Sequence, residues 1–299
     1  MTPKPAECGI ALAAQYQKFL SVFADLDLLE SAVRDTANEQ VRRSLEVAAR
    51  LKAEGLEDTS YSHHHMTFRS FIDGKHIFYE SRTRHANQIR EDFRVHQNKQ
   101  NQWIVAEAYE AFKELIDCCY AYAQHIGPPL WKASQLAGLP SSPPPASPTI
   151  DELLKAAANS KVTGDAYAKL TRFRAVYPQL LQVERSNPLS KNPCFTLALI
   201  ELLRHIIVHN GGKPKTRAMF ENRVLTKSGL LNNGKPDKRY VGEIGFYLTE
   251  YQGNCIVLLT DANKPDFPGA YVSRVTLLTN ILMAYGHIIY SELLVPNSV

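Results

Sequence analysis

Apolar and polar residues repeat at helical spacing along most of this 299-residue chain. Six segments carry apolar residues three to four positions apart: Glu39–Ala53, Trp103–His125, Ile150–Ala158, Asp165–Val183, Pro193–His209 and about Gly269–Leu293. This spacing places the apolar side chains on one face of a helix, where they can be buried together. The pattern predicts a mainly α-helical fold.

Two stretches have features typical of strands. Around residues 243–260, apolar runs on either side of Gln252-Gly253-Asn254 predict a β-hairpin. Around Asp73-Gly74 two interpretations stay open. One is a hairpin turn between two short strands, and the other is a short break between helices.

A Pro-rich stretch, residues 127–148, contains seven of the seventeen prolines and predicts a linker or a long surface loop. It suggests three parts. Residues 1–126 form a mainly helical N-terminal region of unknown role, and residues 149–299 form a helical domain that includes the hairpin.

Composition indicates a globular protein, because 44% of residues are hydrophobic and 21% are charged. No apolar run approaches the length of a membrane span, and the N-terminus lacks the pattern of a secretion signal. The five cysteines show no CxxC spacing. We therefore expect a cytoplasmic protein that does not enter a membrane.

Residues 193–209 form the predicted helix with the clearest boundaries. Asn192 can cap its free amides, and Pro193 can occupy the first helical position, where its missing N–H is not needed. Gly211-Gly212 supplies a typical C-terminal stop.

This helix is apolar except for a narrow polar stripe. Glu201, Arg204, His205 and His209 lie within an arc of about 140° at 100° per residue, and the intervening residues are aliphatic. Histidine can act as an acid or a base near neutral pH, and arginine can hold two phosphate oxygens. These are groups that metal-free RNA cleavage requires.

The sequence Arg204-His205-Ile206-Ile207-Val208-His209 resembles the Arg-x(4–6)-His signature of HEPN domains, a helical family rich in metal-independent ribonucleases. The resemblance covers roughly the C-terminal half of the chain. It implies a HEPN-like helical bundle into which the hairpin is inserted. It also implies a homodimer, because HEPN ribonucleases usually pair two protomers to put two motifs in one cleft.

The resemblance implies a role for each residue of the motif. Arg204 would clamp the phosphate, and His209 would be the acid–base residue. His205 would orient or polarise the site, while Asn210 would hydrogen-bond the substrate or cap the helix. The expected activity is a metal-independent endonuclease that cleaves RNA through the 2′-hydroxyl, with no cofactor, in a toxin–antitoxin or antiviral defence setting.

Other interpretations of the motif stay open. The chain can be a non-catalytic HEPN module for nucleotide binding or dimerisation, or Arg204 can simply pair with Glu201 one turn away. An antitoxin or nucleotidyltransferase partner is suggested by the family alone. Zinc is not expected: His205 and His209 have the spacing of two helical zinc ligands, but Ile206 stands where zinc proteases need glutamate.

Positive charge is concentrated after the motif. Residues 211–239 contain eight basic and two acidic residues, a net charge of +6, whereas the whole chain carries +4. Such a segment attracts a polyanion in a salt-dependent way. We therefore expect a basic loop that binds RNA through Lys213, Lys215 and Arg217, although a solvated loop is the plainer alternative.

Overall fold

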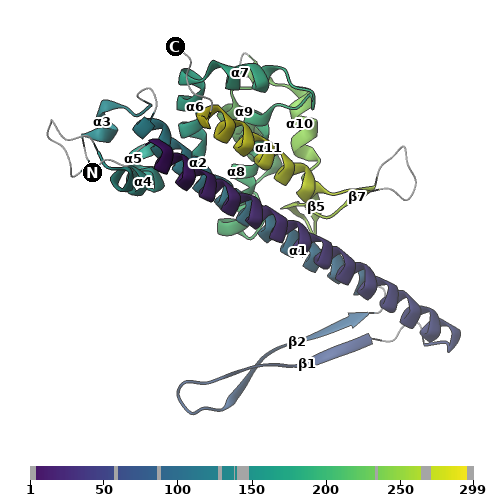
Figure 1. The fold of residues 1–299 in the computed structure, drawn as a ribbon. Helices are drawn as coiled ribbons and strands as arrows, with labels where there is room; N and C mark the ends of the chain where they lie inside the picture. The colour runs from purple at the N-terminus through teal and green to yellow at the C-terminus, as the bar shows by residue number, and fades with distance from the viewer. Residues whose placement is uncertain are drawn as a thin grey trace. The chain divides into compact units, whose positions relative to one another are not determined.

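The computed structural model describes residues 5–56, 60–85, 89–126, 130–137, 139, 148–232, 235–263 and 271–294. The fold is mainly helical (Figure 1). The helices are α1 (Pro5–Ala53), α2 (Ile89–Ile126), α3 (Ala133–Leu136), α4 (Ile150–Ala158), α5 (Ser160–Thr163), α6 (Ala166–Val176), α7 (Pro178–Arg185), α8 (Pro193–Asn210), α9 (Arg217–Ser228), α10 (Lys238–Gly245) and α11 (Arg274–Leu294).

Within the described residues, the strands pair into four antiparallel two-stranded sheets. The pairs are β1 (Ser60–Arg69) with β2 (His76–His85), β3 (Leu231–Asn232) with β4 (Lys235–Pro236), β5 (Leu248–Tyr251) with β6 (Asn254–Val257), and β7 (Ala262–Asn263) with β8 (Tyr271–Val272). Among the described residues, no helix combines the length and the apolar character that crossing a membrane requires.

The chain forms two compact units. Unit 1 comprises residues 1–29 and 102–299, and unit 2 comprises residues 30–101. The predicted division into 1–126, 127–148 and 149–299 stays a prediction. Much of the Pro-rich stretch, including residues 140–147, lies outside the described residues.

The core of unit 1 is formed by apolar faces of α1, α2, α8 and α11 together with the shorter helices. A glycine allows three of these helices to approach closely. A Cβ added to Gly286 of α11 would lie 3.0 Å from Leu115 of α2 and 3.1 Å from Phe19 of α1. Burial of this large apolar surface is the main term that stabilises the unit.

Unit 2 contains parts of α1 and α2 and the hairpin of β1 and β2. The strands pair from Ser60 with His85 to Arg69 with His76, so Asp73-Gly74 lies in the connecting turn. Of the two interpretations of this stretch, the hairpin is confirmed. Phe71 and Ile72 in the turn are fully solvent-exposed.

The second predicted hairpin is also present, as β5 and β6. Tyr251 pairs with Asn254 across a two-residue turn in which Gln252 and Gly253 both have positive φ, 49° and 72°. This conformation matches the right-handed twist of paired strands. Whether the hairpin is an insertion into a HEPN bundle stays a prediction.

Helix α8 has nearly its predicted bounds. The Asn192 side chain accepts a hydrogen bond from the Phe195 amide at 3.0 Å, and Pro193 occupies the first turn. Gly211 ends the helix with a left-handed backbone, φ 61°. Eleven of its residues are buried.

Two predictions of local structure were wrong. The segment 165–183 is two helices, α6 and α7, because Pro178 cannot donate a backbone hydrogen bond and instead begins a new helix. The basic segment after the motif is largely helix α9, and not a loop. The Thr216 side chain caps α9 and Gly229 ends it, while Phe220, Val224 and Leu225 bury its inner face.

Candidate functional site

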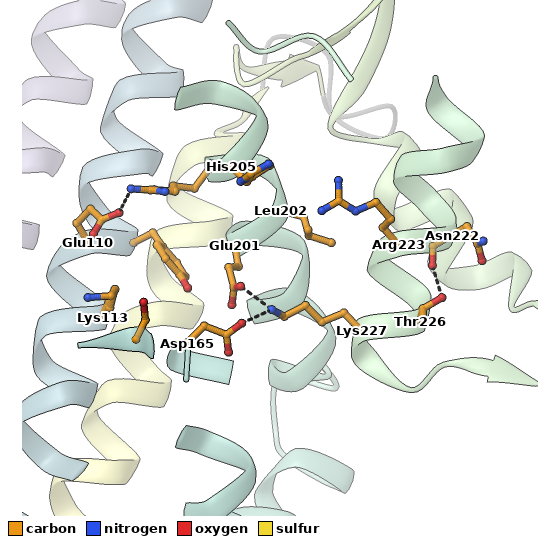
Figure 2. A pocket seen from close by; sticks show the side chains of 13 residues that line it. Glu110, Lys113, Asp165, Glu201, Leu202, His205, Asn222, Arg223, Thr226 and Lys227 are labelled. Atoms are coloured by element: carbon orange, nitrogen blue, oxygen red, sulfur yellow. Dashed lines mark hydrogen bonds and ion pairs between the residues drawn. The ribbon is translucent and has the colours of Figure 1, made fainter. Parts of the chain in front are cut away.

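A pocket of about 610 Å³ lies in unit 1 between α2, α8 and α9 (Figure 2). Its charged and titratable lining residues are Tyr109, Glu110 and Lys113 on α2, Asp165 before α6, Glu201, Arg204 and His205 on α8, and Arg223 and Lys227 on α9. Two of the predicted site residues, Arg204 and His205, therefore line a cavity that also contains several carboxylates.

Arg204 pairs with a residue of another helix. Its Nη2 atom lies 2.5 Å from Oε1 of Glu110 on α2, and both side chains are partly exposed, at 28% and 44%. The Nε atom of Arg204 is buried and has no hydrogen-bond partner among the described residues. The alternative in which Arg204 simply pairs with Glu201 is wrong, since Glu201 pairs with Lys227.

Lys227 lies between two carboxylates. Its Nζ atom is 2.8 Å from Oδ2 of Asp165 and 2.5 Å from Oε1 of Glu201, as the dashed lines in Figure 2 show. Burial raises the pKa of Glu201, an effect that the nearby ammonium group opposes. Glu201 Oε2 is buried with no hydrogen-bond partner among the described residues.

His205 and His209 are adjacent on the exposed side of α8, with ring centroids 4.8 Å apart. Burial is the largest cause that lowers the pKa of His205 below 6.5. The positive charges of His209, Arg223 and Arg204 lower it further. His205 is therefore biased toward the neutral form, which can accept a proton.

The end of α8 is held against the β5–β6 hairpin. The Val257 amide donates to the Gly212 carbonyl at 2.8 Å, and the buried Gln102 side chain donates to the Val257 carbonyl at 2.7 Å. A Cβ at Gly212 would lie 2.6 Å from the Gln102 side chain, so glycine is required for this close approach. His209 and Asn210 are exposed just before this anchor.

The predicted RNA-binding residues follow that end of the helix. Lys213, Lys215 and Arg217 are all exposed. Arg217 is not a free cation, since its Nε atom pairs with Glu221 at 2.7 Å. Their contact with RNA stays a prediction.

Within one chain, Arg204 and His209 are not brought together. Five residues along a helix rotate the side-chain direction by about 140°. No hydrogen bond or ion pair joins the two side chains in the part of the chain that the structure describes. Arg204 extends toward α2, whereas His209 packs beside His205.

Several charged residues of the pocket were missed by sequence reasoning. The sequence pattern places Arg223 and Lys227 only within the basic segment, and Asp165 only at the start of a predicted helix. No motif or spacing in the sequence marks Glu110 as a site residue. It is 94 positions before Arg204 in the sequence, so only the packing of α2 beside α8 brings the pair together.

The described residues contain no group of three or more His, Cys, Asp or Glu side chains arranged to hold a metal ion. Comparison with known proteins gives no further guide. No protein-family model matches the chain, and neither do any curated protein or solved structure.

Proposed function

We propose that this chain is a metal-independent RNA endonuclease of the HEPN type, which cleaves through the 2′-hydroxyl. One observation carries the proposal. Helix α8 is buried along most of its length, yet it directs Arg204 into a charged pocket and exposes the His205–His209 pair at its end. Exposed, adjacent imidazoles beside a guanidinium are the groups that this reaction needs.

The reaction needs two proton transfers. A neutral imidazole removes the 2′-hydroxyl proton, and the 2′-oxygen attacks phosphorus. The bond between phosphorus and the 5′-oxygen breaks, and a second acid protonates that oxygen. The products are a 2′,3′-cyclic phosphate and a free 5′-hydroxyl, and arginine stabilises the charge on the pentavalent intermediate.

A second copy of the chain supplies the missing groups. Since Arg204 and His209 diverge around α8, the proposed active form is a homodimer with the two motifs facing each other. Arg204 and His209 of both protomers then share one cleft, and His205 and Asn210 orient the substrate. Lys213, Lys215 and Arg217 bind the RNA backbone. A toxin–antitoxin or antiviral defence role, with an antitoxin or nucleotidyltransferase partner, follows from the family resemblance alone.

One observation favours a second candidate function, a non-catalytic module for nucleotide binding or dimerisation. The guanidinium of Arg204 is engaged by Glu110. In a module of this kind Arg204 would bind a nucleotide or stabilise the structure. The His209→Ala substitution would then not change the rate of any residual RNA cleavage.

The decisive experiment incubates purified protein with a defined RNA in EDTA. We expect cleavage to persist in EDTA, to leave 2′,3′-cyclic ends, and to stop when the cut nucleotide carries a 2′-deoxy substitution. His209→Ala should lower the rate by about 10²–10⁴-fold, the usual contribution of a general acid or base. His125→Ala is the matched control, since His125 lies in the last turn of α2 and does not line the pocket.

The same experiment can refute the proposal. Loss of cleavage in EDTA would indicate metal-dependent chemistry. A wild-type rate of RNA cleavage in His209→Ala would rule out His209 as the acid–base residue. RNA cleavage by a protein that light scattering shows to be monomeric would rule out an active site shared between two protomers.

A further inference from the structure

Three residues that line the pocket between α2, α8 and α9 each have a buried polar atom that lacks a hydrogen-bond partner among the described residues. Arg204 Nε is a donor, and Glu201 Oε2 and Glu110 Oε1 are acceptors when ionised, although Glu110 Oε1 is in ion-pair contact with Arg204 Nη2. Buried polar atoms are nearly always hydrogen-bonded, and exceptions commonly mark the place of a ligand or an ordered water. Because these residues line one pocket, a ligand that satisfies Arg204 Nε and Glu201 Oε2 carries both an acceptor and a donor.

The charges of the pocket are only partly separated in space, because Glu110 accompanies the arginines on the cationic side and Lys227 accompanies the two carboxylates on the other side (Figure 2). Figure 2 shows His205 and Arg223 on one side of the pocket, together with Glu110, the ion-pair partner of Arg204. Asp165, Glu201 and Lys227 lie on the other side. A ligand that matches this arrangement has an anionic end and an end with N–H or O–H donors.

The cationic side has unused binding capacity. Arg223 is exposed and makes no ion pair or hydrogen bond with another described residue. Arg204 makes one ion pair, with Glu110, whose side chain is 44% exposed although the paired oxygen Oε1 is buried. A phosphate group can therefore replace Glu110 at Arg204, because a guanidinium binds two phosphate oxygens at once.

The size of the pocket also restricts the ligand. A volume of about 610 Å³ falls in the range typical of small-molecule sites, roughly 300–1,000 Å³. An inorganic anion would fill only a part of it and would offer no donor to Oε2 of Glu201, whose other oxygen already accepts from Lys227. A nucleotide provides the phosphate, the ribose hydroxyls and the base N–H groups in one molecule.

We propose that this pocket binds a single ribonucleotide unit, with its phosphate at Arg204 and Arg223 and its donor groups toward Glu201 and Asp165. The inference rests on the proposed function in that the bound unit belongs to the RNA that is cut. In the free protein Glu110 takes the place of the phosphate. Arg223, Glu201 and Glu110 thereby become residues that select and bind the substrate.

The test measures binding by calorimetry in EDTA with the four nucleoside 3′-monophosphates, the four nucleosides and inorganic phosphate. We expect at least one nucleotide to bind ten times more tightly than inorganic phosphate and than its own nucleoside. Equal binding of inorganic phosphate would reduce the site to a simple anion site and overturn the proposal. No binding of any nucleotide would show that the pocket holds water.

Variants of three residues separate the two sides of the pocket. Arg223→Met should weaken nucleotide binding about tenfold or more, as expected for loss of a charge-assisted hydrogen bond. Glu110→Gln should strengthen it about two- to fivefold, because it frees Arg204 from a partly exposed ion pair. Glu201→Gln should weaken nucleotide binding and leave the binding of inorganic phosphate unchanged.

Lys155→Met is the matched control for loss of a positive charge, since Lys155 is exposed on α4 and does not line the pocket. If Glu201→Gln does not fold, nucleotide binding by the two variants at the solvent-accessible positions 110 and 223 tests the proposal. Weaker binding in Glu110→Gln, or unchanged binding in Arg223→Met, would overturn the proposal.

The same samples distinguish failure of this inference from failure of the proposed function. RNA cleavage without nucleotide binding would refute the nucleotide pocket and leave the ribonuclease intact. Nucleotide binding that changes as predicted in the three variants, without RNA cleavage, would refute the proposed ribonuclease activity and support the nucleotide pocket.

Discussion

Unit 1 contains two arginines that pair with a glutamate from another helix, and the two pairs differ in how fully their polar atoms are used. Arg174 of α6 pairs with Glu184 of α7 at 2.7 Å, and the side chains are only 11% and 8% exposed. The Tyr285 hydroxyl of α11 donates to the same carboxylate. The guanidinium of Arg174 also contacts this hydroxyl at 3.4 Å.

The pair of Arg204 and Glu110 has the opposite character. Both side chains are more exposed, and Nε of the arginine has no hydrogen-bond partner among the described residues. The difference indicates two uses of the same chemistry. A buried pair that shares hydrogen bonds with Tyr285 connects three helices. A partly exposed pair beside a pocket, in which one polar atom lacks a partner, can exchange its partner for a ligand.

The largest expected effect comes from breaking the ion pair of Arg174 and Glu184. Arg174→Met leaves the Glu184 carboxylate buried without its cation, so we expect the free energy of unfolding to fall by about 3 kcal/mol or more. Urea unfolding at pH 7 measures this. The double variant Arg174→Met, Glu184→Leu should recover much of the loss, because the unpaired charge is then removed. A loss below about 1 kcal/mol in the single variant would contradict a structural role for this network.

The corresponding change at Arg204 should have a much smaller effect on stability. We expect Arg204→Met to lower the free energy of unfolding by no more than about 1 kcal/mol, because partly exposed ion pairs contribute little. The same urea titration provides the value. If Arg204→Met and Arg174→Met destabilise the protein equally, the distinction between the two pairs is wrong, and Arg204 is a structural residue.

The features of the fold that could be predicted from the sequence depend on local signals. Helix α8 lies between Asn192 and Gly211, whose roles in capping and ending a helix require no knowledge of the rest of the chain. The hairpin turn at Gln252-Gly253 is equally local. Helix α9 carried similar signals at Thr216 and Gly229, but its high charge led to the prediction of a loop.

The arrangement of the candidate site could be predicted only in part. Local spacing identified Arg204, His205 and His209 as a polar stripe on one helix, and it also indicated that the side chains spread over a wide arc. The partners of the stripe come from elsewhere. Glu110 and Lys227 reach α8 through tertiary packing, and one sequence contains no record of contacts between residues that distant.

The smallest expected effect concerns the protonation of His205 at the edge of the pocket. Burial, and then the charges of His209, Arg223 and Arg204, hold its pKa below 6.5. Removing one of these cations favours the imidazolium form. In Arg223→Met the pKa of His205 should therefore rise toward 6.5, and the acidic limb of the RNA cleavage profile should move to higher pH if His205 must be neutral.

The sign of the stability change follows from the same shift. Between the pKa of His205 in the folded protein and 6.5, the unfolded chain binds more protons, so stability falls as the pH drops through this window. Arg223→Met should make that fall smaller. NMR titration of the His205 ring measures the pKa directly, with Lys155→Met as the control that should leave it unchanged. An unaltered pKa of His205 in Arg223→Met would show that Arg223 does not face His205. Arg223 would then not belong to the cationic side of the pocket.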